Sequence, residues 1–288
     1  MTIEAVFRGL CPNCGGDIPA SRLAEGLPCS ECLPSKKALE LMRDGYLRKL
    51  KIIEEKVRGI DEIFLKVINS RMWGLQRLWA RRFFNNESFA MIAPTGSGKT
   101  TMQIILALYA AREGRRSLIL VPTSLLASQV YSKTINIRDK LELNNVKVVA
   151  YHSLMTEKSK REAVNDVGEA FIIITTPASL MKKPELRQQI NIAFIDDVDS
   201  FLRRSKSVEI VLRMLGVTEE DEDMVTKIQE LESEARKLAL ENPEEARRLL
   251  DMAHKLRTSL QERAKGIIIV SGATQTARRT KRVRMLNT

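Results

Sequence analysis

The hydrophobic pattern from residue 88 onward consists of short apolar runs separated by longer stretches that are charged or have helical periodicity. The runs that predict buried strands are 89–92, 118–121, 146–150, 171–174, 192–195 and 266–270. Continuous apolar runs of this kind are typical of parallel strands that are covered on both faces. Because strands alternate with helical stretches, we predict an α/β fold with a parallel, doubly wound sheet and flanking helices.

Two further stretches show helical periodicity outside this alternation. Between residues 35 and 70 the apolar residues recur at helical spacing, which predicts an amphipathic helix that Gly59 is expected to break. Its apolar positions are Leu39, Met42, Tyr46, Leu50, Ile53 and Val57. Between residues 217 and 264, an acidic start followed by two apolar stripes predicts a helical hairpin. The pattern fits a hairpin that packs only on itself as well as one that contacts a partner.

The stretch 93–100, A-P-T-G-S-G-K-T, has the context of a phosphate-binding loop, because an apolar run precedes it and a helical stretch follows. Glycines let backbone N–H groups turn toward a triphosphate, and the helix N-terminus adds partial positive charge. The residues expected to surround the nucleotide are Pro94, Thr95, Gly96, Ser97, Gly98, Lys99 and Thr100. Lys99 would reach the β- and γ-phosphates, and the Thr100 hydroxyl would bind Mg²⁺.

An acidic cluster, D-D-V-D at 196–199, follows directly after a predicted buried strand. Asp196 would hold the Mg²⁺ that bridges the β- and γ-phosphates, and Asp197 could orient and deprotonate the attacking water. Aspartates at the end of a strand are also common turn formers. The apolar run before them and the phosphate-binding loop together favour the magnesium interpretation.

All four cysteines lie before residue 33, in a C-x₂-C pair, a gap of fourteen residues and a second C-x₂-C pair. This spacing lets the thiolates of Cys11, Cys14, Cys29 and Cys32 close tetrahedrally on Zn²⁺. Two disulfides or a redox pair are the alternatives, which a cytosolic setting and the paired spacing disfavour. Four cysteine ligands leave no open coordination position, so the sequence predicts a structural zinc site.

Composition adds a charge argument. Of the 288 residues, 44% are hydrophobic, and 47 Lys and Arg against 36 Asp and Glu give a net charge of +11, which favours a polyanionic partner. The basic run 278–284 is either a solvated tail or a nucleic-acid contact, and hydroxyl-rich turns at 122–124 and 175–179 offer donors to a nucleic-acid backbone. With no apolar run approaching ~20 residues and no secretion signal, we expect a cytoplasmic protein without a membrane partner.

Several of these stretches together resemble the motor of superfamily 2 helicases. They are Gln76, A-P-T-G-S-G-K-T, P-T-S-L-L-A-S-Q at 122–129, T-T-P-A-S-L at 175–180, D-D-V-D and S-G-A-T at 271–274. The N-terminal C-P-N-C-G-G, the Y-H-S at 151–153 and the D-D-V-D form make the chain more similar to reverse gyrases. The resemblance implies a RecA-like ATP-binding domain in which Gln76 reads the adenine edge, although a glutamine on a helix is often only a surface residue.

The resemblance also implies a domain plan and a function. A Cys₄ zinc finger would occupy 1–40, a helical connector 41–75, and a RecA-like helicase domain 76–288 with the insertion 217–264. Reverse gyrases of hyperthermophiles couple ATP hydrolysis to positive supercoiling of DNA. They do so with a second RecA-like domain and a type IA topoisomerase portion, so we expect this chain to be a fragment or subunit that hydrolyses ATP poorly alone. The alternatives are a stand-alone helicase-like ATPase and a nucleotide-switched DNA-binding module.

Overall fold

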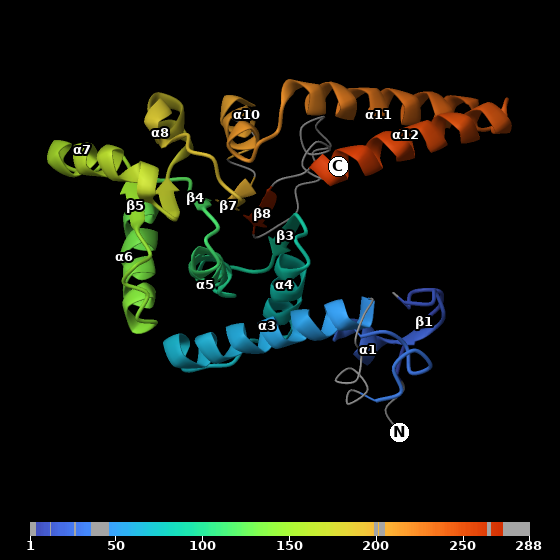
Figure 1. Ribbon diagram of the computed structural model, residues 1–288, viewed down its shortest axis with the longest axis horizontal. Coiled ribbons are helices and arrows are strands. Elements are labelled where there is room, and N and C mark those ends of the chain that lie inside the picture. The colour runs from blue at the N-terminus through green and yellow to red at the C-terminus, as the bar shows by residue number, and fades with distance from the viewer. Residues whose placement is uncertain are drawn as a thin grey trace. The chain divides into compact units, whose positions relative to one another are not determined.

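The computed structural model describes residues 4–11, 13–25, 27–35, 46–198, 201, 205–263 and 266–272. The chain divides into two compact units, Met1–Glu87 and Ser88–Thr288, each of which has its own internal contacts (Figure 1). Each unit is described by itself. The predicted domain boundaries stay a prediction.

The second unit contains a six-stranded sheet. Its strands are β3 (Phe89–Ile92), β4 (Ser117–Leu120), β5 (Val148–Tyr151), β6 (Ile172–Thr175), β7 (Ile192–Asp196) and β8 (Ile267–Gly272). They lie in the order β3–β8–β7–β4–β6–β5, and every neighbouring pair is parallel. The predicted α/β fold with a parallel sheet is therefore confirmed, and the order places β8, the last strand of the described residues, between β3 and β7.

Among the described residues, five helices flank this sheet. They are α5 (Lys99–Arg112), α6 (Ser124–Lys140), α7 (Glu157–Asp166), α8 (Pro177–Lys182) and α10 (Ser205–Met214), with short 3₁₀ turns at Val167–Glu169 and Pro184–Leu186. In Figure 1, α5 and α6 lie on the opposite side of the strands from α8 and α10. Both faces of the sheet are thus covered, which explains why the strands read as continuous apolar runs and not as an alternating pattern.

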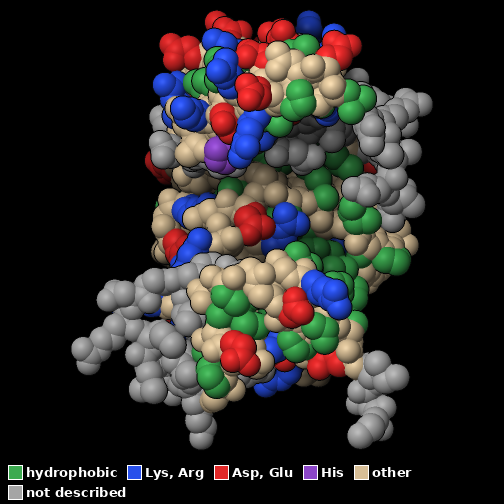
Figure 2. Space-filling view, turned by 90° about the vertical axis from the view of Figure 1, so that its right-hand side faces the viewer, with side chains coloured by type: hydrophobic (Ala, Val, Ile, Leu, Met, Phe, Trp, Pro, Cys, Tyr) green, Lys and Arg blue, Asp and Glu red, His purple; other side chains and the backbone are tan. Residues whose placement is uncertain are grey.

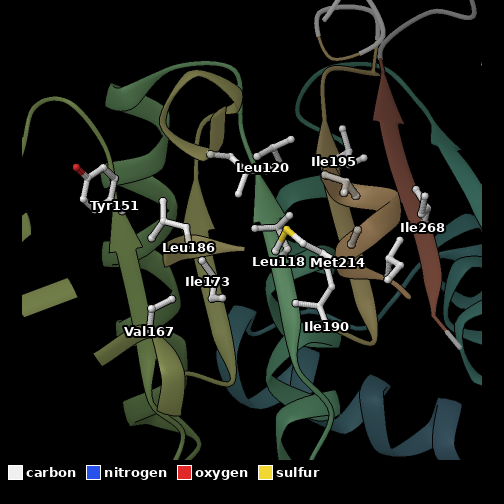
Figure 3. Close-up of a cluster of buried hydrophobic side chains, with 14 of the residues drawn as sticks. Leu118, Leu120, Tyr151, Val167, Ile173, Leu186, Ile190, Ile195, Met214 and Ile268 are labelled. Atoms are coloured by element: carbon white, nitrogen blue, oxygen red, sulfur yellow. The ribbon is translucent and has the colours of Figure 1, made fainter. Parts of the chain in front are cut away.

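One face of the sheet carries a large apolar cluster. Leu118, Leu120, Ile173 and Ile195 project from neighbouring strands to the same side (Figure 3). Side chains of α7, α8 and α10 and of the turns after them complete the cluster, including Ala163, Leu180, Leu186, Val211 and Met214. Because successive strand residues point to opposite faces, Ile119 and Phe194 belong to the other face, where α5 packs. This double packing fixes the strand ends that carry the candidate site.

Between β7 and β8 the chain forms the predicted hairpin of α11 (Glu219–Leu238) and α12 (Pro243–Arg263). Thr218 caps α11: its Oγ1 accepts from the Asp221 N–H at 3.3 Å, and Asp221 Oδ2 accepts from the Thr218 N–H at 2.8 Å. The residues buried in the hairpin include Val225, Ile228, Ala235, Ala246 and Ala253. Figure 2 shows both acidic and basic side chains on the face of the hairpin that is turned toward the viewer.

The first unit is small and mostly helical. A two-stranded antiparallel ribbon, β1 (Val6–Phe7) and β2 (Ile18–Pro19), leads into α1 (Ala20–Ala24), and α3 (Tyr46–Ile68) packs on α4 (Gly74–Phe84). The expected break at Gly59 is wrong, because α3 continues through it. A helical glycine costs only about 1 kcal/mol relative to alanine, and burial of Val57 and Ile60 on either side outweighs that cost. Residues 36–45 of the predicted helix, with Leu39 and Met42, lie outside the described residues.

Candidate nucleotide site and cysteine cluster

The glycine loop lies where the sequence predicts it, between the end of β3 and the start of α5. Gly96 has φ 80° and Gly98, the residue before α5, has φ 84°. A side chain in this left-handed region costs roughly 1–2 kcal/mol, so both positions require glycine. Pro94, Thr95 and Gly96 are exposed, while Ser97 to Thr100 are half-buried. The loop therefore presents its backbone at the N-terminal end of a long buried helix, where a phosphate group is favoured.

Lys99 folds back over the start of this loop. Its Nζ donates to the carbonyl oxygens of Ala93 at 2.6 Å and Pro94 at 2.9 Å. The ammonium group is thus held at the mouth of the loop by two neutral acceptors and not by a carboxylate. An anionic oxygen is a stronger acceptor than a carbonyl, so this lysine can exchange these contacts for a phosphate.

Asp196 is the last residue of β7 and pairs in register with Ser271 of β8. Ser271 is fully buried, and its Oγ donates to Asp196 Oδ1 at 2.5 Å. The bond fixes the orientation of the carboxylate while leaving its second oxygen available for a cation. Asp197, the next residue, is exposed and has φ 57°, an uncommon backbone conformation for a residue other than glycine. Asp199 lies outside the described residues.

The loop and the acidic strand end meet through β8. The N–H of Ala93 donates to the Gly272 carbonyl at 3.4 Å, and Gly272 directly follows Ser271. Because β3, β8 and β7 are neighbours and parallel, their carboxyl ends lie along one edge of the sheet, the usual place for a ligand in such folds. The structure thus brings the predicted loop and the predicted acidic cluster to one edge. It also identifies Ser271 as the described hydroxyl of S-G-A-T that contacts the aspartate, whereas Thr274 lies outside the described residues.

A second group of polar residues lies at the carboxyl ends of β4, β5 and β6. The hydroxyls of Ser124 and Ser153 are hydrogen-bonded at 2.8 Å, and Thr176 Oγ1 donates to Ser179 Oγ at 3.0 Å. The leucines that follow the two serines, Leu125 and Leu154, are 61% and 66% exposed. Hydroxyl groups and exposed apolar side chains therefore both occur at this part of the edge.

The neighbouring helices add positive charge to this part of the edge. The basic cluster, as we define it, consists of Lys158, Lys160, Arg161, Lys182 and Lys183. The pKa of Glu157 is lowered first by its hydrogen bond and ion pair with Lys160 and further by the charges of Arg161 and Lys183. Residues from α7 and from the end of α8 thus act on the same carboxylate. His152, buried beside them, has its pKa lowered first by burial and then by the charge of Lys160.

Gln76 lies on α4 in the first unit, where it is 6% exposed. Its Oε1 accepts from the Trp73 N–H at 3.3 Å, so the side chain satisfies a donor at the start of the helix. This contact gives Gln76 a structural role, because it stabilises the N-terminal end of α4. The predicted contact of its amide with adenine stays a prediction.

The four cysteines form a cluster, as the spacing predicts. Their Sγ atoms all lie within 4.8 Å of one another, and those of Cys14 and Cys29 are 3.7 Å apart. Four thiolates at the usual Zn–S distance of about 2.3 Å from one ion would be separated by about 3.8 Å. All four are free thiols, since a disulfide would require about 2.05 Å. The geometry fits a Cys₄ metal site and excludes the disulfide alternative for this structure.

Backbone N–H groups donate hydrogen bonds to two of these sulfur atoms and so favour their thiolate forms, which bind a cation. The N–H of Cys29 donates to Cys11 Sγ at 3.2 Å, and that of Gly16 donates to Cys14 Sγ at 3.4 Å. Burial alone would raise the pKa of Cys11, but N–H donors led by Cys29 lower it to about 6. The Gly16 N–H lowers the pKa of Cys14, yet contacts with the other three thiols raise it to about 12. Crowded thiols thus oppose a second deprotonation, which a bound divalent cation would relieve.

Two arginines that sequence reasoning missed organise this part of the chain. Arg22 donates to the carbonyl oxygens of Pro28 at 2.7 Å and Leu33 at 2.6 Å, closing the second cysteine turn. Arg81 of α4 donates to the Ala24 carbonyl at 2.9 Å and pairs with Glu54 of α3 at 2.5 Å. The cysteine cluster is therefore tied to the two helices of the same unit. No sequence pattern indicates these contacts, because each arginine donates to backbone carbonyl groups, which every residue possesses.

Comparison with known families now decides the class of the protein. Residues 74–229 match the family model of the DEAD/DEAH box helicase, which is more than half of the chain, and residues 2–49 match the reverse gyrase zinc finger. The chain belongs to the DEAD/DEAH box helicase family. It combines a helicase-like domain of this family with the zinc finger of reverse gyrases, as the resemblance implies.

The similar proteins include reverse gyrases, in agreement with the match to the reverse gyrase zinc finger. Reverse gyrase of Pyrobaculum aerophilum is 40% identical over 95% of the chain, and reverse gyrase 1 of Aquifex aeolicus is 34% identical over 94%. The chain spans about a quarter of the length of these relatives, 24% in each case. Among solved structures, the DUF1998 helicase MrfA bound to DNA superposes with a TM-score of 0.51 at 17% identity. That superposition covers 79% of this chain and 28% of MrfA, and it supports the RecA-like helicase fold.

The helicase match begins at residue 74, so it includes α4 with Gln76 as well as the sheet. It ends at residue 229, within α11, before the hairpin returns to β8. Among the helices of the described residues, none is long and apolar enough to cross a membrane.

Proposed function

We propose that this chain is the ATP- and DNA-binding N-terminal part of a reverse gyrase. In such an enzyme, ATP hydrolysis would be coupled to positive supercoiling by a second RecA-like domain and a type IA topoisomerase portion outside this chain. The observation that carries the proposal is the meeting of the glycine loop, Ser271 and Asp196 at one sheet edge, in a chain that also has the reverse gyrase zinc finger.

At the nucleotide site, backbone N–H groups of the glycine loop would bind the phosphates, and Lys99 would exchange two carbonyl acceptors for β- and γ-phosphate oxygens. Thr100 and Asp196 would hold Mg²⁺, which would neutralise charge on these oxygens. Ser271 keeps the Asp196 carboxylate in one orientation for this task. The amide of Gln76 would recognise the adenine edge, which carries both a donor and an acceptor.

Hydrolysis transfers the γ-phosphoryl group to water. The water oxygen forms a bond to the γ-phosphorus while the bond from that phosphorus to the β–γ bridging oxygen breaks, which yields ADP and phosphate. We assign Asp197 as the group that orients the water and accepts its proton. Its exposure and its strained φ of 57° at the tip of the acidic strand support this role, since strain of this kind clusters at functional sites.

The carboxyl ends of β4, β5 and β6 would hold DNA. Hydroxyl groups such as those of Ser124 and Ser153 suit phosphate and sugar oxygens, and the basic cluster supplies the electrostatic attraction. The exposed leucines Leu125 and Leu154 offer apolar surface against which unpaired bases can lie. Zinc in the cysteine cluster would be structural, since all four ligand positions are filled by the chain.

The proposed function is tested by ATP turnover with and without single-stranded DNA, for this chain alone and after addition of the remaining domains. We expect slow turnover alone, because a site closed by two domains lacks half of its charge stabilisation, and a rise on reconstitution. The Asp197→Asn variant should lose turnover in both settings while it still binds nucleotide. Brisk, DNA-stimulated turnover by the isolated chain would contradict the shared site.

A further inference from the structure

A lysine on α6 contacts the first turn of the helix that follows the glycine loop. Nζ of Lys133 donates to Oγ1 of Thr101 at 2.6 Å. Thr101 is 8% exposed and directly follows Thr100, the proposed magnesium ligand. Because α5 and α6 also contact each other, this bond joins the helix of the nucleotide site to its neighbour.

The charge of Lys133 has no acidic partner in the part of the chain that the structure describes. Its hydrogen bond goes to a neutral hydroxyl. The residue as a whole is exposed, but its ammonium group is partly buried, and this burial lowers the pKa of Lys133. The N-terminal turn of a helix carries partial positive charge, so a cation beside it is unfavourable unless an anion is near. A polyphosphate in the glycine loop is such an anion.

The same helix reaches the other half of the sheet edge. Thr123 caps α6 by accepting from the Leu126 N–H at 3.2 Å, and Ser124, its first residue, is hydrogen-bonded to Ser153. Lys133 follows Ser124 by nine residues, which corresponds to about 13 Å along one continuous helix. One rigid element therefore carries a hydroxyl of the proposed DNA edge at one end and a contact with the nucleotide helix further along.

We propose that the Lys133–Thr101 hydrogen bond is a positioning contact that couples nucleotide binding at the glycine loop to DNA binding at the Ser124 end of α6. Lys133 acts through Thr101 on the first turn of α5, whose N–H groups face the phosphates. The inference rests on the proposed function, since it takes a polyphosphate at the loop and DNA at the edge. Coupling of this kind is reciprocal, so each ligand tightens the other by the same factor.

The test measures the dissociation constant of a fluorescent, non-hydrolysable ATP analogue with and without saturating single-stranded DNA. The ratio of the two constants is the coupling factor. The variants are Lys133→Met, which keeps most of the stem, Lys133→Arg, which keeps the charge, and Thr101→Val, which removes only the hydroxyl. Lys227→Met is the matched control, because Lys227 is an exposed lysine on α11, a helix that contributes no residue to either proposed binding site. Thermal unfolding of each variant checks that it folds.

We expect the wild-type factor to be about fivefold or more. It should approach one in Lys133→Met and Thr101→Val and recover partly in Lys133→Arg. The double variant should be no worse than either single variant, because both remove one contact. An unchanged factor in folded Lys133→Met or Thr101→Val overturns the inference. A wild-type factor of one also overturns it but leaves the proposed function intact, whereas failure to bind either ligand removes both.

Discussion

The zinc finger and the helicase sheet of this chain are stabilised in different ways. Among the described residues of the finger, the buried apolar clusters are small: Cys11, Ile18 and Cys29 form one, and Leu27 and Leu33 form another with Leu50 of α3. The sheet, in contrast, has a cluster of twenty buried residues on one face alone. A segment with so few apolar contacts needs another source of free energy, and the four thiols provide a place for it.

The largest expected effect follows from metal removal. Structural zinc contributes roughly 10–16 kcal/mol in small finger peptides, so chelation or Cys29→Ser should unfold residues 4–35. The sheet should stay folded, because none of its strands contributes a ligand. Amide hydrogen exchange measured by mass spectrometry checks this: peptides of the finger should lose protection, while peptides of β4 and β7 keep it. Loss of protection in both regions at once would contradict the claim that the finger and the sheet are stabilised in different ways.

A substitution that leaves a cavity beside the sheet should destabilise the second unit and leave the zinc finger unchanged. Leu118 is fully buried in the centre of the large cluster, so Leu118→Ala is expected to destabilise the second unit by about 2–5 kcal/mol. Zinc content, measured by atomic absorption, should not change. The control is Leu125→Ala, since Leu125 is 61% exposed and its truncation should change the unfolding free energy by less than about 0.5 kcal/mol. Loss of zinc from folded Leu118→Ala would show that the regions are not independent.

Asp61 gives a smaller effect that depends on pH. It is 5% exposed and accepts from the Met72 N–H at 2.7 Å, from Arg71 at 2.8 Å and from Arg77 at 3.1 Å. Burial raises its pKa, but the Met72 N–H and the two arginines outweigh burial, so the pKa lies below the usual 3.8. The stabilisation is therefore present above pH 3.8 and is lost as pH falls through the lowered pKa.

Asp61→Asn should remove this stabilisation at neutral pH, where we expect the first unit to lose about 2 kcal/mol. Denaturant unfolding of wild type and variant between pH 2 and pH 7 checks the prediction, with the difference shrinking at the acid end. Asp223→Asn, at an exposed acid on the hairpin, is the control. A difference that stays constant down to pH 2 would contradict the assigned cause.

Sequence reasoning succeeded where local pattern decides the structure. The apolar runs located all six strands of the parallel sheet, since strands covered on both faces contain few polar residues. The spacing of the cysteines predicted their cluster, and the glycine loop appeared in its predicted context. Gly59 was the local failure, because tertiary burial of its neighbours outweighs the low helix propensity of glycine.

Contacts that depend on strand order could not be predicted. Ser271 and Asp196 are hydrogen-bonded only because β8 inserts between β3 and β7, and sequence order gives no sign of that insertion. The Lys133–Thr101 bond depends in the same way on how two helices lie beside each other. Arg22 and Arg81 bind carbonyl oxygens, which every residue possesses, so no residue pattern indicates their partners. The sequence therefore predicted the site's parts but not the contacts between them.

Nucleotide affinity tests the central claim that the glycine loop and the acidic strand end form one site. The measurement is the dissociation constant of the fluorescent ATP analogue, with and without Mg²⁺, for wild type, Lys99→Ala, Asp196→Asn and the control Asp223→Asn. The account predicts that Lys99→Ala weakens binding about tenfold or more, equivalent to about 1.4 kcal/mol. It predicts that Asp196→Asn removes most of the gain from Mg²⁺, and that the control matches wild type. Binding by Lys99→Ala and Asp196→Asn that equals wild type under both conditions would contradict it.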